Sequence, residues 1–263
     1  MQWQRAAYTR GAMFPCLGGM RWWPLTAMAG IFHAPIDKVV RTAQPWKAAR
    51  GSPWRSRRHP DLDEAIGAHA PYLLGVETAA FAVTSRDGEW TAALSSAAPA
   101  RGDLQYLRAR AAYDVKCEFV GVEWAPAGDE VFANATFTHL QAGRGLFRRC
   151  RPDDARWIQA SDQDETWEFD AVGEPLPFEE PQRYTARRKA GRLGLDMLGR
   201  YLAALGVPVD DAGWLTGPVV AAVRQPHPLA VRPGAQPWST PEDLRGVVGY
   251  PQDHVPADLM GWK

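Results

Sequence analysis

This sequence has few cysteines and no net charge. Only three of the 263 residues are cysteines, Cys16, Cys117 and Cys150, and none has CxxC spacing. An odd, scattered set argues against a disulfide scaffold or a zinc knuckle and is typical of a reducing compartment, so we expect a cytoplasmic protein. The formal net charge is zero, so composition provides no evidence for a nucleic acid, an anionic membrane or an acidic substrate.

The chain also lacks long apolar runs. An uninterrupted run of about 18 apolar residues would predict a transmembrane helix, and none is present. Near the N-terminus, Arg5 and Arg10 precede an apolar stretch, as they would in a signal peptide. Arg21 and a pair of glycines interrupt that stretch, so neither a signal peptide nor a membrane partner is expected.

Arginine and tryptophan are abundant instead. Lysine occurs only five times among the 30 basic residues, an imbalance that we attribute to coding composition rather than to chemistry specific to arginine. The 12 tryptophans are many for this length. Each brings a large apolar area and one hydrogen-bond donor, which suits a core or an aromatic contact surface.

We predict a single α+β domain over residues 25–224, with a few helices packed against a mostly antiparallel meander sheet of five to seven strands. Residues 1–24 show no clean period and are expected to be irregular. Residues 225–263 contain seven prolines, which predict an extended C-terminal tail.

Apolar residues at helical spacing predict five helices. Pro35 separates the first two, Asp61 is the expected N-cap of the third, and Gly206 is the expected stop of the last. The predicted helices cover residues 26–34, 35–43, 61–73, 101–115 and 185–205.

Alternating, turn-bounded segments predict strands in the middle of the chain. Asp87-Gly88 lies between two such runs and predicts a hairpin, because tight turns need a positive φ. Short links favour antiparallel pairing of consecutive strands over βαβ winding. The strands are expected in a hairpin over residues 77–96 and in residues 115–124, 130–140, 145–151, 155–160 and 165–172.

No motif in the sequence has the spacing of a catalytic centre. There is no GxSxG elbow, no cysteine–histidine signature and no Walker or GxGxxG frame, so no catalytic residue and no cofactor are assigned. Two histidines and three acids lie between His59 and His69. Pro60 separates His59 from the helix that would carry His69, so no metal site is expected. An enzyme that binds a small molecule or a phosphate stays open as an alternative, with a pocket around His139 or Arg148–Arg151.

DNA binding by residues 25–58 is the other alternative. The two short helices expected at 26–34 and 35–43 would form a helix-turn-helix. The following segment is expected to be a basic loop, with Arg50, Arg55, Arg57 and Arg58. The second helix presents few polar side chains for reading base edges, so this alternative ranks below protein binding.

Opposite charges are segregated between residues 162 and 192. Eight acids lie from Asp162 to Glu180, and five bases lie from Arg183 to Arg192. We predict a clasp of opposite charges that seats the last helix. The alternative is that the surplus acids are presented to a basic partner, with Trp157 and Trp167 as aromatic anchors. The clasp residues are Phe178, Glu179, Arg187, Arg188 and Arg192. The partner-binding residues are Trp157, Asp162, Asp164, Glu165, Trp167 and Glu168.

These observations favour a non-catalytic protein-binding module. No catalytic constellation is present, tryptophan is abundant and the charges form local runs of one sign. Neutralisation of a protein partner, as immunity proteins and antitoxins perform it, would fit this pattern, and the expected partner is a protein with a basic surface.

Overall fold

The computed structural model describes eleven parts of the chain. They are residues 22, 25–48, 54–73, 78–96, 114–125, 134–142, 155–163, 166–208, 211, 213–223 and 237–247. The predicted strand at 145–151, most of the predicted helix at 101–115, and Arg50, Asp164 and Glu165 lie outside these residues.

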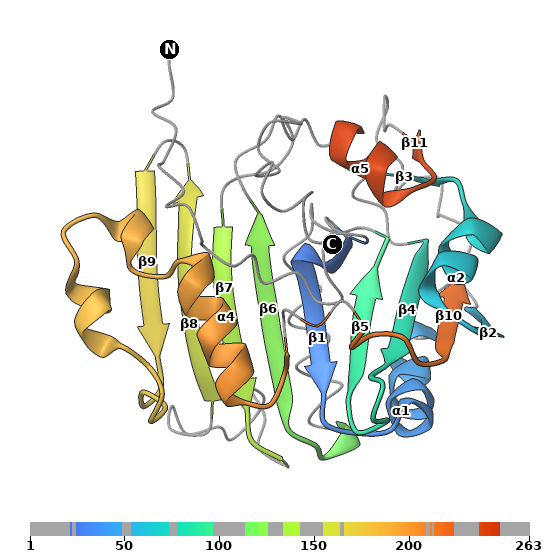
Figure 1. Ribbon diagram of the computed structural model, residues 1–263, viewed down its shortest axis with the longest axis horizontal. Helices are drawn as coiled ribbons and strands as arrows, with labels where there is room; N and C mark the ends of the chain where they lie inside the picture. The colour runs from blue at the N-terminus through green and yellow to red at the C-terminus, as the bar shows by residue number, and fades with distance from the viewer. Residues whose placement is uncertain are drawn as a thin grey trace.

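A nine-stranded sheet dominates the described part of the chain (Figure 1). All neighbouring strands in it are antiparallel, so the prediction of a mostly antiparallel α+β fold is confirmed. The prediction of five to seven strands is wrong. In spatial order the strands are β2 (Arg55–His59), β10 (Val219–Val223), β4 (Ala79–Thr84), β5 (Thr91–Ser95), β1 (Met28–Phe32), β6 (Phe119–Ala125), β7 (Asn134–Leu140), β8 (Ala155–Gln163) and β9 (Thr166–Val172).

Four α-helices accompany the sheet in the described residues. They are α1 (Ile36–Ala48), α2 (Leu62–His69), α4 (Leu195–Ala204) and α5 (Pro241–Val247). Short 3-10 helices of three or five residues are η2 (Leu25–Ala27), η4 (Pro181–Thr185) and η5 (Lys189–Gly191). A second, two-stranded sheet pairs β3 (Tyr72–Leu73) with β11 (Pro237–Trp238). No helix in the described residues is both long and apolar enough to cross a membrane.

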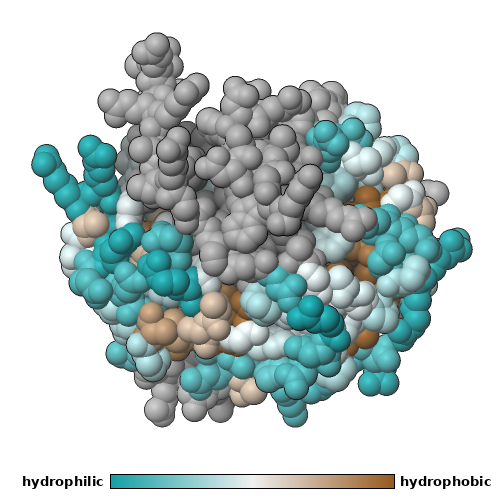
Figure 2. Space-filling model, viewed as in Figure 1, coloured by the Kyte–Doolittle hydropathy of each residue, from teal (hydrophilic) through white to brown (hydrophobic). Residues whose placement is uncertain are grey.

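The two faces of the large sheet bury different side chains, because successive residues of a strand point to opposite faces and cross-strand partners share one. Val122, Phe137 and Ile158 are such partners, and their face packs against the apolar stripe of α4. The rings of Phe137 and Tyr201 lie 5.5 Å apart in an edge-to-face contact. Figure 1 shows α4 in front of β7 and β8, and Figure 2 shows mostly hydrophilic side chains on the described outer surface of this side.

The opposite face carries a second, smaller core. Phe32 and Phe119 are cross-strand partners with ring centroids 5.1 Å apart, and Val39 of α1 belongs to the same buried cluster. The helix predicted at residues 35–43 is therefore confirmed in α1, with Ile36 and Val39 facing inward.

The helix predicted at residues 26–34 is wrong. Residues 28–32 form β1, which pairs with β5 on one side and β6 on the other and is buried at every position. A strand buried on both faces has no polar alternation, so a short apolar run of this kind is compatible with either a helix or a strand. The adjacent pair of helices on which the DNA-binding hypothesis depended is absent from this segment.

The basic loop expected after α1 is also wrong where the structure describes it. Helix α1 continues to Ala48, and Arg55–His59 form the edge strand β2 beside β10. The only described neighbour of β2 in the sheet is β10, which comes more than 150 residues later in the chain. Strand β10 follows β9 in sequence but lies seven positions from it in the sheet.

The predicted helix over residues 185–205 is confirmed only in its second half. Helix α4 begins at Leu195, after Gly191 and Gly194, and Leu198 and Tyr201 are buried as the apolar stripe predicts. Gly206 ends the helix with φ 81°, a left-handed value that favours glycine. The arginines before Leu195 therefore precede the helix and do not lie in its first turns.

Local turn chemistry was predicted correctly. Asp61 caps α2 by accepting a 2.9 Å hydrogen bond from the Glu64 backbone N–H. The Asp87-Gly88 turn joins β4 and β5, and Gly88 has φ 78°.

The prediction of an extended tail is wrong for residues 237–247, which form β11 and α5. Trp238 and Leu244 are fully buried there, and the Trp238 ring lies 4.5 Å from that of Tyr72.

Candidate functional site

The residues predicted to bind a partner do not form one surface. Asp162 and Trp167 are cross-strand partners on the face that α4 covers, and one carboxylate oxygen of Asp162 is buried without a hydrogen bond to any described residue. Trp157 and Glu168 project from the opposite face, because they alternate with those positions along β8 and β9. Asp164 and Glu165 are outside the described residues.

The opposite face of β8 and β9 carries a distinct group of side chains, which we call the β9 patch. Val172 is 48% exposed and is the one large hydrophobic side chain exposed in the described part of the chain. Its cross-strand partner is Trp157, which is half-buried, and Asp170 and Glu168 follow on the same face with exposed carboxylates. The β9 patch therefore consists of Trp157, Glu168, Asp170 and Val172.

Two members of the β9 patch, Asp170 and Val172, were absent from the predicted set. The period-two pattern of TWEFDAV carries the signal, because residues 168, 170 and 172 share a face with each other and not with Trp167. The predicted set contains side chains from both faces of the sheet, because acids and tryptophans occur on both.

A buried ion pair fastens the segment after β9. Arg156 of β8 holds Glu179 through both carboxylate oxygens, with Nε–Oε1 at 2.8 Å and Nη2–Oε2 at 2.7 Å. The Leu176 backbone N–H and the Tyr184 hydroxyl also donate to this carboxylate, at 3.0 and 2.7 Å. Arg156 Nη1 donates to the carbonyl oxygens of Val172 and Gly173 at 3.1 and 2.7 Å. Both charges are thus fully hydrogen-bonded, which is what a buried pair requires.

Of the predicted clasp residues, Glu179 lies inside a charged contact, and its cation is Arg156. Arg187 and Arg188 are exposed and form no ion pair with any described residue. Arg192 donates to the Ala186 carbonyl at 2.9 Å and lies over the Phe169 ring. The true cation is Arg156, which comes from a strand rather than from the basic run and was absent from the predicted clasp.

Aromatic side chains complete this network. Phe178 is half-buried and its ring lies 5.6 Å from that of Tyr201. The hydroxyls of Tyr184 and Tyr201 are 3.0 Å apart. Burial, together with these hydrogen bonds, raises the pKa of Tyr184 far above its ordinary value, so the phenol stays protonated and serves as a donor to Glu179.

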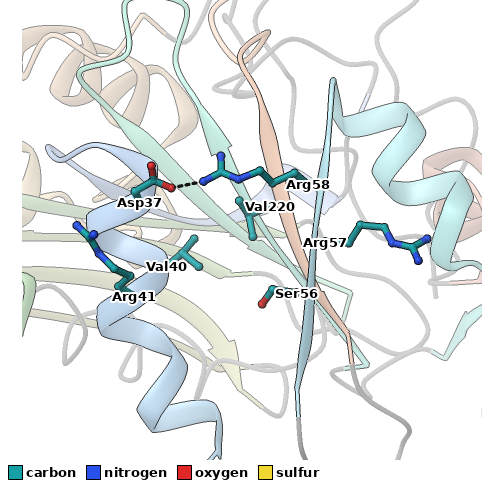
Figure 3. Close-up of a pocket in the computed structure, with 7 residues that line it drawn as sticks. All are labelled: Asp37, Val40, Arg41, Ser56, Arg57, Arg58 and Val220. Atoms are coloured by element: carbon teal, nitrogen blue, oxygen red, sulfur yellow. Dashed lines mark hydrogen bonds and ion pairs between the residues drawn. The ribbon is translucent and has the colours of Figure 1, made fainter.

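A cleft of about 440 Å³ lies between α1 and the edge strand β2 (Figure 3). Arg58 crosses it to form an ion pair with Asp37, while Figure 3 shows Arg41 and Arg57 pointing in opposite directions. The cations therefore do not converge on one point, as a phosphate site would require. The lining residues are Asp37, Val40, Arg41, Ser56, Arg57, Arg58 and Val220.

Glu118 links two histidines where β1 ends and β6 begins. His139 Nε2 lies 2.8 Å from Glu118 Oε1, and His33 Nδ1 lies 3.5 Å from Glu118 Oε2. The hydrogen bond from His139 is the main cause that lowers the pKa of Glu118 below its ordinary value of 4.5. The carboxylate separates the two rings, so the three groups form a hydrogen-bonded chain and do not surround a common centre.

The remaining candidates for chemistry are one thiol and one histidine pair. Cys117 is buried, and burial raises its pKa to about 11, which keeps the thiol protonated at neutral pH. His59 and His69 meet, against expectation, with their Nε2 atoms 3.1 Å apart. Arg148–Arg151 lie outside the described residues, and His139 is not among the residues that line the cleft between α1 and β2.

Comparisons with known proteins give no assignment: no family model, no curated protein and no solved structure matches this chain. The geometry of its own residues must therefore carry any functional argument.

Proposed function

We propose that this protein is a non-catalytic protein-binding module that holds a basic partner at the β9 patch. The observation that carries the proposal is the exposed Val172 beside Trp157 and two carboxylates on a strand at the edge of the sheet. Contiguous apolar patches rimmed by polar residues mark contact surfaces, and Val172 with its neighbour Trp157 forms a small patch of this kind between two carboxylates and the strand end.

The position of β9 supports this proposal. It is the last strand of the sheet, and no other described strand pairs with its outer edge. An edge strand presents backbone donors and acceptors that a strand of another protein can pair with. At seven residues β9 is long enough for such pairing to set a register.

The charges on this strand support a basic partner. Glu168 and Asp170 form no ion pair with any described residue, and both are exposed. A partner strand with Lys or Arg at every second position would place its cations opposite them, because cross-strand neighbours on one face lie about 5 Å apart. Electrostatic complementarity of this kind raises association rates and selects the partner.

Catalysis and DNA recognition have weaker support in the described residues. Glu118, His33 and His139 do not converge, and the arginine cleft lacks convergent cations. The first helix that the helix-turn-helix hypothesis requires is not formed, because residues 28–32 are strand β1. Arginines remain on β2, so duplex DNA serves as a control ligand in the experiment below.

The test is affinity purification of a partner from cells that naturally make the protein. We expect wild type to recover a stoichiometric protein, and Glu168→Lys/Asp170→Lys and Val172→Lys each to reduce the recovery at least tenfold. Glu89→Lys/Glu242→Lys is the matched control, because these two acids are also exposed and lie on other elements. Equal loss in this control, or no stoichiometric partner of the wild type, would contradict the proposal. Tight binding of duplex DNA with loss on Arg55→Glu/Arg57→Glu would support the alternative.

Neutralisation of a toxic protein stays a prediction within this proposal. It is tested by co-expressing the recovered partner with wild type or with Val172→Lys. Growth rescued by wild type alone would support an immunity-like role, and a partner that is harmless when expressed by itself would contradict it.

A further inference from the structure

His59 and His69 form a pair that no pattern in the sequence predicts. His59 is the last residue of β2 and His69 the last residue of α2, and Pro60-Asp61 connect the strand to the helix. The rings are perpendicular, with centroids 5.1 Å apart and Nε2 atoms 3.1 Å apart. Pro60 prevents the two histidines from sharing one helix, but it does not prevent the strand and the helix from bringing them together.

We propose that His59 and His69 bind a divalent transition-metal ion of the Zn²⁺, Ni²⁺ or Cu²⁺ group through their Nε2 atoms. Two imidazole nitrogens at about 2.0–2.1 Å from a tetrahedral metal are about 3.3–3.4 Å from each other. The observed separation of 3.1 Å needs only a small opening of the pair to reach that geometry. Imidazole nitrogens suit these borderline metals, whereas Ca²⁺ and Mg²⁺ prefer oxygen ligands.

Glu64 supports the arrangement from the other side of the His59 ring. Its Oε1 lies 3.2 Å from His59 Nδ1. A carboxylate on Nδ1 holds the proton there, so the Nε2 lone pair accepts a hydrogen bond from His69 Nε2–H, and a metal ion would replace that proton between the two nitrogens. Metal-binding histidines usually have such a carboxylate partner on the other ring nitrogen. The His59 side chain is only 2% exposed, so packing fixes the ring orientation as well.

The site is open on the His69 side. His69 is half-buried at the end of its helix. No third histidine, cysteine or carboxylate converges with the pair in the described residues. Water would occupy the other metal positions, and a site with two protein ligands is expected to bind more weakly than a closed structural site with four.

The experiment is a metal titration of the full chain without an affinity tag, after removal of metal with EDTA. We expect one equivalent of Zn²⁺ to bind in competition with a chromogenic chelator at pH 7.5. His69→Gln should weaken binding at least tenfold, because its amide can still donate to His59 Nε2 but is a poor metal ligand. Glu64→Gln should weaken it by about 10–100-fold while leaving both ligands in place. His33→Gln changes a half-exposed histidine elsewhere and should bind as wild type does.

Electron paramagnetic resonance of the Cu²⁺-loaded wild type gives a second readout that does not depend on any variant folding. Nitrogen couplings from two imidazoles are expected. No binding of Zn²⁺, Ni²⁺ or Cu²⁺ at 1:1 stoichiometry, a Cu²⁺ spectrum without two nitrogens, or wild-type affinity in a folded His69→Gln would each overturn the proposal. None of these outcomes bears on the β9 patch.

Discussion

Glu179 and Glu180 are neighbours in the chain and have opposite environments. Glu179 is buried against Arg156, whereas Glu180 pairs with Arg200 at the surface, where the two side chains are 30% and 51% exposed. Breaking a buried, hydrogen-bonded pair leaves the other charge unpaired in the interior, while water replaces the partner of an exposed one.

We therefore expect Glu179→Gln to lower the free energy of unfolding by about 3–5 kcal/mol. The adjacent Glu180→Gln should lower it by less than about 1 kcal/mol. Urea denaturation of both variants measures the difference. Similar losses in the two variants would mean that the Arg156–Glu179 contact does not fasten the segment after β9.

Glu118 makes the free energy of unfolding depend on pH, and its hydrogen bond with His139 determines the sign of that dependence. The hydrogen bond from His139 holds the pKa of Glu118 below its ordinary 4.5 in the folded protein. The unfolded chain thus binds more protons than the folded one between the lowered pKa and 4.5. The contribution of Glu118 is complete above pH 4.5 and is lost as the pH falls through the lowered folded pKa.

We accordingly expect wild type to be more stable than Glu118→Gln at pH 6, and the gap to close as the pH falls below 4.5. Urea denaturation of both proteins across pH 3–6 measures it. A gap that stays constant over this range would contradict the assigned role of the carboxylate.

At the scale of elements, replacing glycine by alanine is expected to change stability in opposite directions inside α2 and just after α4. Gly206 stops α4 with φ 81°, where a Cβ is strained, whereas Gly67 lies inside α2, where an added Cβ would meet no atom within 4 Å. Gly206→Ala should destabilise the protein by about 1–2 kcal/mol. Gly67→Ala should stabilise it by about 0.5–1 kcal/mol, since alanine favours a helix interior. Thermal melts of the two variants should shift in opposite directions, and a shift of the same sign would contradict the assigned helix ends.

Elements with local signals were predictable, and those whose identity depends on distant partners were not. Asp61 as a cap and Asp87-Gly88 as a turn act through bonds within a few residues, so their sequence is sufficient. Residues 28–32 become a strand because β5 and β6 supply hydrogen bonds on both sides. Nothing in five consecutive buried residues distinguishes that outcome from a buried helix.

At the scale of the whole molecule, the C-terminal segment contributes to the core despite its prolines. Trp238 is 1% exposed and packs on Tyr72, which joins β11 and β3 to the large buried cluster. Trp238→Ala should cost about 3–5 kcal/mol in the free energy of unfolding, as expected for a large aromatic side chain removed from a core. A loss below about 1 kcal/mol would show that residues 237–247 contribute little to stability.

The two ends of the sheet differ in charge. Strand β2 has Arg55, Arg57 and Arg58 at one end, and β9 has Glu168 and Asp170 at the other. Charged side chains on both outer strands oppose uncontrolled edge-to-edge pairing of like edges, because equal charges would face each other. The same charges leave each edge open to a partner of opposite sign, and only β9 adds an exposed apolar residue to them.

The sequence by itself determined the fold class, the capped helix α2, the hairpin at Asp87-Gly88 and the apolar stripe of α4, since each depends on periodicity or on contacts between near neighbours. Only the tertiary structure decided which side chains from distant segments meet. It paired Glu179 with Arg156, placed Trp157 and Trp167 on opposite faces, and brought His59 to His69. The physical reason is that strand register and the direction of a returning helix depend on long-range packing, which no local pattern encodes.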